Sequence, residues 1–222
     1  MLAAGNPFIS SYLQSDWFGK GIFLALFFLS ILCWVILLAK IWQVKRVKRI
    51  SRQFLDNLSG AKGSPLDWQL PKQGEHPLFE VFRRIKQQSL LILEKRQGIF
   101  GTGDIDMVEA EAAMAIGAAV SKLERLLFLL PTIASLAPFL GLLGTVWGIL
   151  LTFSELGVAR GNQNEMLAGL SMALATTVLG LLIAIPALVG NSYLRNETKV
   201  ARRELEEFSH RLLSSLELEH RS

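Results

Sequence analysis

Hydrophobic positions along this chain collect in three long runs without a charged residue, separated by stretches rich in Lys, Arg, Glu and Asp. The runs extend from Gly21 to Ala39, from Leu126 to Ser154 and from Met166 to Leu194. A soluble domain would instead spread its apolar residues at helical or strand spacing around one core. A helix of about 20 apolar residues crosses a hydrocarbon core about 30 Å thick. The pattern therefore predicts three membrane spans, of which the second and third are long enough to tilt or to continue into water.

Basic residues are distributed unevenly around these runs and indicate an orientation. A dense block follows the first run, and a second group follows the third, whereas the connection between the second and third runs holds only Arg160. The block and the group consist of Lys40, Lys45, Arg46, Lys48, Arg49 and Arg52, and of Arg195, Lys199, Arg202 and Arg203. The positive-inside rule then places the N-terminus outside and the C-terminus in the cytoplasm. Trp17, Phe18 and Trp42 flank the first run, as aromatic belt residues do.

These features predict an all-α polytopic membrane protein with three transmembrane helices and long cytoplasmic helical extensions. The expected segments are an outer N-terminus 1–16, a first span 17–42, a cytoplasmic helical region 43–125, a second span 126–154, an outer loop 155–165, a third span 166–194 and a cytoplasmic helical tail 195–222.

Apolar spacing and breakers subdivide the cytoplasmic part. Helices are expected over Val44–Leu58 and Leu78–Arg96, with loops at Gly60–Pro77 and Gly98–Gly103. Another helix is expected to begin at Asp104, to run through Lys122 and to continue directly into the second span. The tail 191–218 should be continuous with the third span, with an apolar seam of Val200, Leu205, Phe208, Leu212 and Leu216.

Composition excludes several classes of function. The net charge of +4 comes from basic residues beside the apolar runs and not from an aromatic-interleaved face, which argues against nucleic acid. Cys33 is the only cysteine, so no internal disulfide can form. The sequence offers no metal-ligand spacing, no cofactor motif and no nucleophile with a base, so neither a metal site nor an enzyme is expected. His76, His210 and His220 are predicted to be solvated.

The second and third runs contain no Asp, Glu, Lys, Arg or His. A proton relay that worked alone would need an ionisable group inside the membrane. Small residues and hydroxyls instead recur at steps of three and four, which places them along one face of each helix. The two stripes are Ala134, Pro138, Gly141, Thr145, Gly148 and Thr152, and Gly169, Ala173, Thr177, Gly180 and Ala184.

Thr145 and Thr177 are predicted to lie at one depth, about 15 to 18 Å inward from the outer loop. Two interpretations stay open at this point. The hydroxyls form a polar ring in an apolar surface, or the stripes only let helices pack closely while each hydroxyl bonds a carbonyl one turn back.

Two segments, Ala137-Pro-Phe-Leu-Gly-Leu-Leu-Gly-Thr-Val-Trp-Gly-Ile149 and Ala173-Leu-Ala-Thr-Thr-Val-Leu-Gly-Leu-Leu-Ile-Ala-Ile-Pro-Ala187, closely resemble the TolQ/ExbB family of bacterial inner-membrane motor proteins, within the wider MotA/TolQ/ExbB group. The resemblance implies a homo-oligomer, a five-fold ring whose second and third spans line a pore. It also implies a single-span partner similar to TolR or ExbD that brings the membrane aspartate. Driven by the proton-motive force, the complex would move a TolA- or TonB-like protein that crosses the periplasm and acts on the outer envelope.

Thr145 and Thr177 coincide with the family's pore threonines, and Pro138 and Pro186 with its prolines. A wider set is expected to line the pore or to pack helices: Pro138, Gly141, Gly144, Gly148, Thr152, Ala173, Thr176, Gly180 and Pro186. Met172 stands where many relatives have a glutamate, so a carboxylate near the outer mouth of the pore is missing. The short outer N-terminal segment favours TolQ over ExbB, and three spans argue against the flagellar stator branch. The rival interpretation is a passive membrane scaffold or solute channel without proton coupling.

Overall fold

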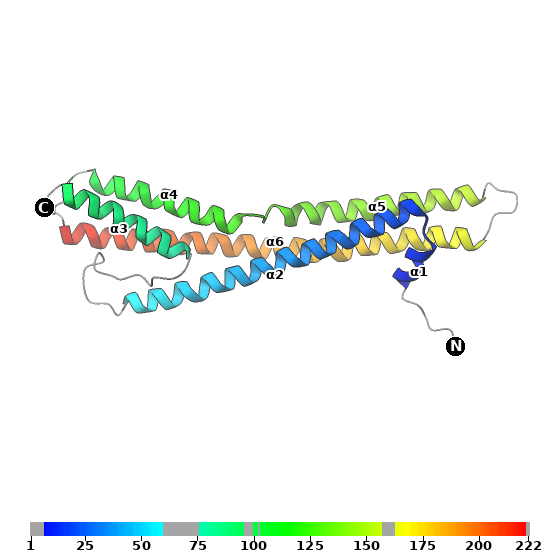
Figure 1. Ribbon diagram of the computed structural model, residues 1–222, viewed down its shortest axis with the longest axis horizontal. Coiled ribbons are helices and arrows are strands. Elements are labelled where there is room, and N and C mark those ends of the chain that lie inside the picture. The colour runs from blue at the N-terminus through cyan, green and yellow to red at the C-terminus, as the bar shows by residue number, and fades with distance from the viewer. Residues whose placement is uncertain (1–6, 60–75, 96–99, 102, 157–162, 221–222) are drawn as a thin grey trace. The chain divides into compact units, whose positions relative to one another are not determined.

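The computed structural model of the chain describes residues 7–59, 76–95, 100, 101, 103–156 and 163–220, and every element in these ranges is a helix (Figure 1). The helices are α1 (Pro7–Gln14), α2 (Trp17–Ser59), α3 (Pro77–Lys95), α4 (Asp104–Glu124), α5 (Leu129–Leu156) and α6 (Gln163–His220). Three stretches, Trp17–Ser51, Asp104–Ser154 and Gln163–Leu218, contain helices long and apolar enough to cross a membrane. The prediction of an all-α polytopic membrane protein is confirmed.

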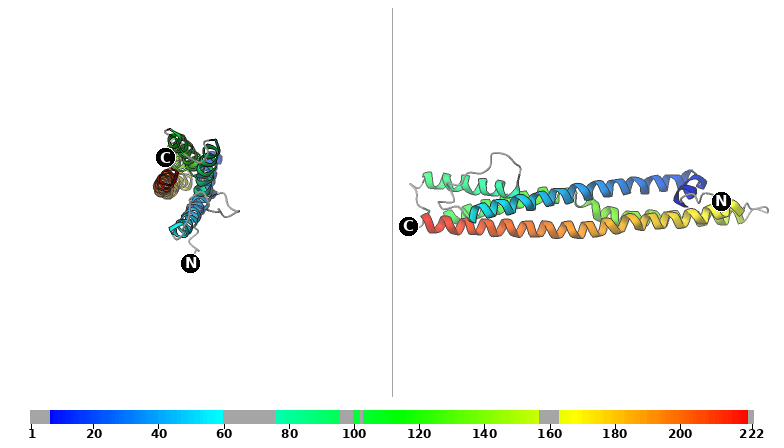
Figure 2. Two further views of the ribbon diagram at one scale, coloured as in Figure 1. Left: turned by 90° about the vertical axis from the view of Figure 1, so that its left-hand side faces the viewer. Right: turned by 90° about the horizontal axis from the view of Figure 1, so that it is seen from below.

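The chain divides into two compact units. The first comprises 1–39 and 126–193, and the second comprises 40–125 and 194–222. Helices α2 and α6 each contribute to both units, and Figure 2 shows α6 as one uninterrupted helix. The predicted continuity of the tail with the third apolar run is therefore confirmed. The helix expected over Val44–Leu58 is the end of α2, which continues from the first run to Ser59.

The first unit is built on an antiparallel hairpin of α5 and residues 163–193 of α6, with α2 beside it (Figures 1 and 2). Gly190 of α6 lies against Leu37 of α2, and Gly19 of α2 lies against Met172 of α6. Large apolar side chains on all three helices remain exposed, including Phe27, Phe139 and Leu174 at 65%, 68% and 66%. Such outward-facing apolar surface is expected where the surroundings are lipid or other membrane helices.

The second unit has a conventional apolar core. Helices α3 and α4 run antiparallel, since Lys122 at the end of α4 pairs with Glu80 at the start of α3 at 2.9 Å, and Arg84 pairs with Glu111 at 2.9 Å. Four of the five predicted seam residues of the tail, Leu205, Phe208, Leu212 and Leu216, are buried in the core with residues of α3 and α4, and Val200 is half-buried. The expected helix over Leu78–Arg96 is confirmed within a residue at each end.

The expectation that the helix beginning at Asp104 continues directly into the second span is wrong. Helix α4 ends at Glu124, Arg125 leaves the helical region with φ −53° and ψ 129°, and Leu126 has φ 70°. Helix α5 begins only at Leu129. Proline at position 131 supplies the reason, because inside a continuous helix its ring would clash with the carbonyl of Leu127 and one backbone bond would be lost. In the first turn of a new helix the missing N–H costs nothing.

The predicted loops at 60–77 and 98–103 and the outer loop at 155–165 fall largely outside the described residues. The segment 1–16, which was predicted to lie outside, contains a helix that the hydrophobic pattern did not indicate, α1. It rests against the hairpin through a hydrogen bond of 2.6 Å between the hydroxyls of Ser11 and Ser171.

Candidate functional site

Small residues bring α5 and α6 of the hairpin unusually close together. A methyl group added at Gly148 would lie 2.5 Å from the carbonyl oxygen of Gly169, and one added at Gly180 would lie 2.6 Å from that of Ala137. At Gly141 the nearest atom would be the carbonyl oxygen of Thr176, at 2.9 Å. Backbone thus packs on backbone at these three positions, where glycine leaves room for the close approach. The stripe residues Gly141, Gly148, Gly169 and Gly180 accordingly pack the two helices of one chain.

Thr176 lies inside this helix pair. Its side chain is fully buried, its methyl and hydroxyl groups fill the space beside Gly144, and its hydroxyl lies 2.9 Å from the carbonyl of Met172 and 3.1 Å from that of Ala173. The hydroxyl is therefore satisfied by its own helix, as is usual for threonine in membrane helices. Ala173, which is also buried, contacts Gly148 in the same interface.

Thr145 and Thr177 occupy a different environment. The hydroxyl of Thr145 is exposed and donates to the carbonyl of Leu142 at 2.6 Å. That of Thr177 is half-buried and donates across the hairpin to the carbonyl of Gly141 at 3.3 Å. Both hydroxyls keep their lone pairs available for a further hydrogen bond.

Counting residues predicted that the hydroxyls of Thr145 and Thr177 lie at one depth. The two hydroxyls bond the carbonyls of adjacent residues, Leu142 and Gly141, but the backbones of the two threonines differ in height. The Cα of Thr177 lies beside Gly141, which precedes Thr145 by four residues. The Cα of Thr145 is therefore about one helical turn, or about 6 Å, nearer the end of the hairpin where α5 leads to α6 than the Cα of Thr177 is. The count from the loop assumed that both helices begin at the same height.

The remaining predicted residues lie along the same hairpin. Thr152 donates to the carbonyl of Gly148 at 2.8 Å, and its hydroxyl contacts the space beside Gly169. Pro138 and Pro186 are half-buried inside α5 and α6. Each removes one backbone hydrogen bond from its helix and so frees a carbonyl one turn earlier.

Met172 is buried with 1% of its surface exposed and packs against Gly19 at the start of α2. A side chain at this position points into the protein chain itself. The same corner holds Asp16, whose carboxylate accepts the backbone N–H of Gly19 at 2.9 Å and the indole N–H of Trp147 at 3.1 Å. Asp16 is thus the N-cap of α2 and also ties that helix to α5. The sequence analysis missed this role, although an aspartate directly before an apolar helix is a recognisable capping signal.

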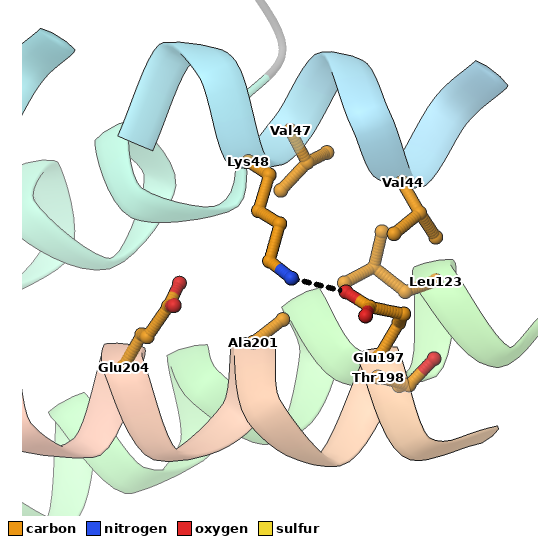
Figure 3. Close-up of a pocket in the computed structure, with 8 residues that line it drawn as sticks. All are labelled: Val44, Val47, Lys48, Leu123, Glu197, Thr198, Ala201 and Glu204. Atoms are coloured by element: carbon orange, nitrogen blue, oxygen red, sulfur yellow. Dashed lines mark ion pairs between the residues drawn. The ribbon is translucent and has the colours of Figure 1, made fainter. Parts of the chain in front are cut away.

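The second unit holds a partly buried ion pair that links α2 to α6. Figure 3 shows Lys48 reaching toward Glu197, and the two charged groups lie 2.7 Å apart beside Val44, Val47 and Leu123. The Lys40 ammonium lies 3.1 Å from the carbonyl of Leu123, close to the end of α4, where helix carbonyls lack partners. Lys48 and Lys40 thus both bond groups of the protein itself.

His76 corrects the expectation that the histidines are solvated, because only 4% of its surface is exposed. Its Nδ1 accepts the backbone N–H of Leu78 at 3.2 Å, and its Nε2 lies 3.0 Å from the carbonyl of Val47. This pattern requires the neutral ring with the proton on Nε2. Burial lowers the pKa of His76, and the hydrogen bond to Val47 acts in the opposite direction. His210 is exposed, as predicted, and the side chain of His220 lies outside the described residues.

Within the described residues no group of three or more His, Cys, Asp or Glu side chains is placed to hold a metal ion. What the hairpin offers chemically is limited to hydroxyls, backbone carbonyls and close-packed apolar surface. Such an arrangement can solvate a proton or its carrier, but it holds no acid or base of its own between Leu126 and Ser154 or between Met166 and Leu194.

Comparison with known proteins gives consistent matches. A family model for the MotA/TolQ/ExbB proton channel family matches residues 79–207. The putative biopolymer transport protein ExbB-like 2 of Helicobacter pylori is 43% identical over 89 residues, which are 40% of this chain and 59% of that protein. The biopolymer transport protein ExbB of Aquifex aeolicus is 47% identical over 75 residues, 33% of this chain and 50% of that protein. The Tol-Pal system protein TolQ of Haemophilus influenzae is 40% identical over 77 residues, 34% of each chain.

These matches span between 34% and 59% of the length of the three relatives. The family model, in contrast, covers more than half of this chain and includes α4, α5, the membrane part of α6 and most of α3. Together with the three apolar helices, it identifies a multi-pass inner-membrane protein of the proton-channel type. The chain belongs to the MotA/TolQ/ExbB proton channel family.

Proposed function

We propose that this chain forms the channel ring of a motor that uses the proton-motive force to drive a periplasm-spanning partner acting on the outer envelope, in a complex of the Tol-Pal or TonB type. The observation that carries the proposal is the hairpin, which contains no ionisable side chain in either apolar run and yet keeps two threonine hydroxyls at its surface. A proton carrier must then come from elsewhere. A single-span partner similar to TolR or ExbD, bearing a membrane aspartate, would supply it.

In this proposal several copies of the chain, five by resemblance, surround the partner helices, with the N-terminus in the periplasm and the C-terminus in the cytoplasm. As the proton passes, the hydroxyls of Thr145 and Thr177 accept hydrogen bonds from water or from the partner's protonated carboxyl group, or donate hydrogen bonds to them. Because the two hydroxyls bond the carbonyls of adjacent residues, Leu142 and Gly141, they would meet the carrier within a short part of its path. Thr176, enclosed by α5 and α6, holds the hairpin together.

The energy available sets the scale of the work. Moving one charge through about 100 mV releases about 2.3 kcal/mol. A useful stroke therefore needs several protons or a shallow energy profile. A fixed charge in the pore would bind the carrier tightly and slow its movement. A pore lined only by hydroxyls and apolar groups has no such tight binding site.

The test is the exchange of hydroxyl for methyl. Thr145→Val and Thr177→Val keep the shape of the side chain and remove its hydrogen bond, so they should preserve expression and assembly and abolish envelope function. Thr145→Ser and Thr177→Ser should retain much of it. The structural loss should be mild, because a hydroxyl bond between membrane helices contributes only about 0.6 kcal/mol on average. The measurements are complex integrity by gel filtration, and detergent sensitivity or ligand uptake of cells that depend on the variant.

Thr176→Val is the matched control for fold, because this hydroxyl is buried between the helices and bonds only to backbone carbonyls. It should retain function as long as the hairpin assembles. Normal function in both Thr145→Val and Thr177→Val would instead leave these residues as packing elements, in line with the bonds that they make to the carbonyls of Leu142 and Gly141. That outcome would favour a passive scaffold or solute channel.

A further inference from the structure

One face of α2 changes from apolar to basic at the end of the first span. Trp42, Lys45, Arg46 and Arg49 follow one another at helical spacing, so their side chains lie on a single face. All four are exposed, Trp42 to 67%. The guanidinium carbon of Arg46 lies 5.6 Å from the centroid of the Trp42 ring, within range of a cation–π contact.

Two neighbouring cations of this stretch, Lys40 and Lys48, bond within the protein. Lys40 bonds the carbonyl of Leu123 and the side chain of Gln43, and Lys48 pairs with Glu197. Lys45, Arg46 and Arg49, in contrast, form no ion pair with any residue that the structure describes. Along the chain no acidic residue occurs between Asp16 and Asp56. Among the described residues, therefore, no acidic side chain neutralises the three positive charges of this face.

The location of this basic face at the end of a membrane span indicates what kind of molecule it could bind. Helix α2 is a membrane span over Trp17–Ser51, so the four residues stand at its basic end, where tryptophan side chains favour the headgroup layer. Each basic residue near a membrane surface gains about 1 kcal/mol from anionic lipid. Arginine can also bind a phosphate through two parallel hydrogen bonds. Charge and location together fit a phosphodiester in the plane of the headgroups.

We propose that Trp42, Lys45, Arg46 and Arg49 form a binding site for the headgroup of an anionic phospholipid. Arg46 and Arg49 hold the phosphate, Lys45 adds charge at its edge, and the Trp42 ring lies at the boundary between headgroup and acyl chain while it stacks on Arg46. The site lies on the exposed face of α2, away from the contacts of Lys40 and Lys48. It does not depend on the direction or the coupling of proton flow.

The test uses the purified full-length protein in detergent, titrated with phosphatidylglycerol or phosphatidylcholine of equal chain length and followed by native mass spectrometry. The wild-type protein should bind phosphatidylglycerol more tightly. Arg46→Gln or Arg49→Gln should each weaken that binding about fivefold, and the triple variant K45Q/R46Q/R49Q by more than tenfold, with phosphatidylcholine binding unchanged. The matched control is R83Q/K95Q/R203Q, which removes the same charge from exposed positions on α3 and α6.

Two results would overturn the proposal. One is a phosphatidylglycerol affinity of the triple variant equal to that of the wild type, or a loss of the same size in the control, which would reduce the effect to net charge. The other is displacement of phosphatidylglycerol by an equal concentration of inorganic phosphate, which would indicate a free-anion site instead of a lipid site. If the triple variant fails to elute as the wild type does, the two single variants decide by the same criterion.

Discussion

Threonine hydroxyls in the hairpin differ in role because of what surrounds them. Thr176 and Thr177 are neighbours in sequence, yet one is enclosed by α5 and α6 and the other lies half-buried at the edge of the pair. A step of one residue turns a side chain by about 100° around a helix, which is enough to move it from the interface to the surface. The enclosed hydroxyl can only stabilise the hairpin, whereas Thr145 and Thr177 can reach a neighbour.

His76 should make the stability of the second unit sensitive to acid. The folded chain needs the neutral ring, and its pKa is lowered by burial. Above about pH 6.5, the ordinary pKa of histidine, the ring is neutral whether the chain is folded or not, so its full contribution to stability is present. As the pH falls through that value, the unfolded chain takes up a proton before the folded chain does, and the free energy of unfolding decreases.

This effect can be measured by thermal unfolding at about pH 7.5 and about pH 5.5, one above and one below the ordinary pKa of histidine. The midpoint of the wild type should fall between these conditions by more than that of His76→Gln. His210→Gln is the control, because His210 is exposed and should leave the fall unchanged. A fall of equal size in all three proteins would contradict the role of His76.

At the level of elements, long continuous helices and one sharp break define the architecture. Helices α2 and α6 each belong to both units, whereas α4 and α5 are separated at Arg125–Phe128. Leu126, with φ 70°, adopts a conformation that is unfavourable for a residue other than glycine. The break is compatible with Pro131 in the first turn of α5. At the end of α4, the ammonium of Lys40 donates to the carbonyl of Leu123.

The close approach of α5 and α6 predicts which glycines tolerate a methyl group. Gly148→Ala and Gly180→Ala place that group 2.5 Å and 2.6 Å from backbone oxygens. Because backbone cannot rotate away, the helices must separate, and a loss of about 1–3 kcal/mol is expected. Thermal unfolding in detergent, with gel filtration to follow assembly, should show a lower midpoint for both variants.

Gly21→Ala and Gly117→Ala are the controls, since apart from the adjacent backbone of its own helix no atom lies within 4 Å of either new methyl group. Both residues are inside helices, where alanine is more favourable than glycine by up to about 1 kcal/mol. These variants should be neutral or stabilising. Equal midpoints for the interface variants and the controls would show that the helices are not packed as closely as described.

On the scale of the whole molecule, the charge pattern predicts how the chain lies in the membrane. In a background where the buried Cys33 is replaced by alanine, a cysteine at Gln163 should react with an impermeant thiol reagent added to intact spheroplasts. A cysteine at Lys95 should react only after lysis, because the basic segments are retained in the cytoplasm. Both positions are exposed, so burial does not limit the reaction. The opposite labelling pattern would reverse the topology.

The sequence alone was sufficient to determine the all-α class, the three apolar helices, the starts of α3 and α4 and the continuity of α6. Each of these rests on local information: an uncharged run of sufficient length, a helical period, or a breaker such as glycine or proline. The family resemblance likewise rests on short segments within the hairpin. These patterns can be interpreted without knowing which residues pack against them. A chain segment that crosses the bilayer as a helix satisfies its backbone hydrogen bonds within itself.

Only the tertiary structure decided which small residues pack within one chain and which hydroxyls stay accessible. Gly144 and Thr145 belong to the same apolar run, but their roles depend on the rotation and height of α6 against α5, which residue counting placed about one turn wrong. The burial of His76 and Met172, and the bond from Trp147 to Asp16, join segments far apart in sequence. Contacts of this kind follow from side-chain fit between helices, and no period or composition along the chain encodes that fit.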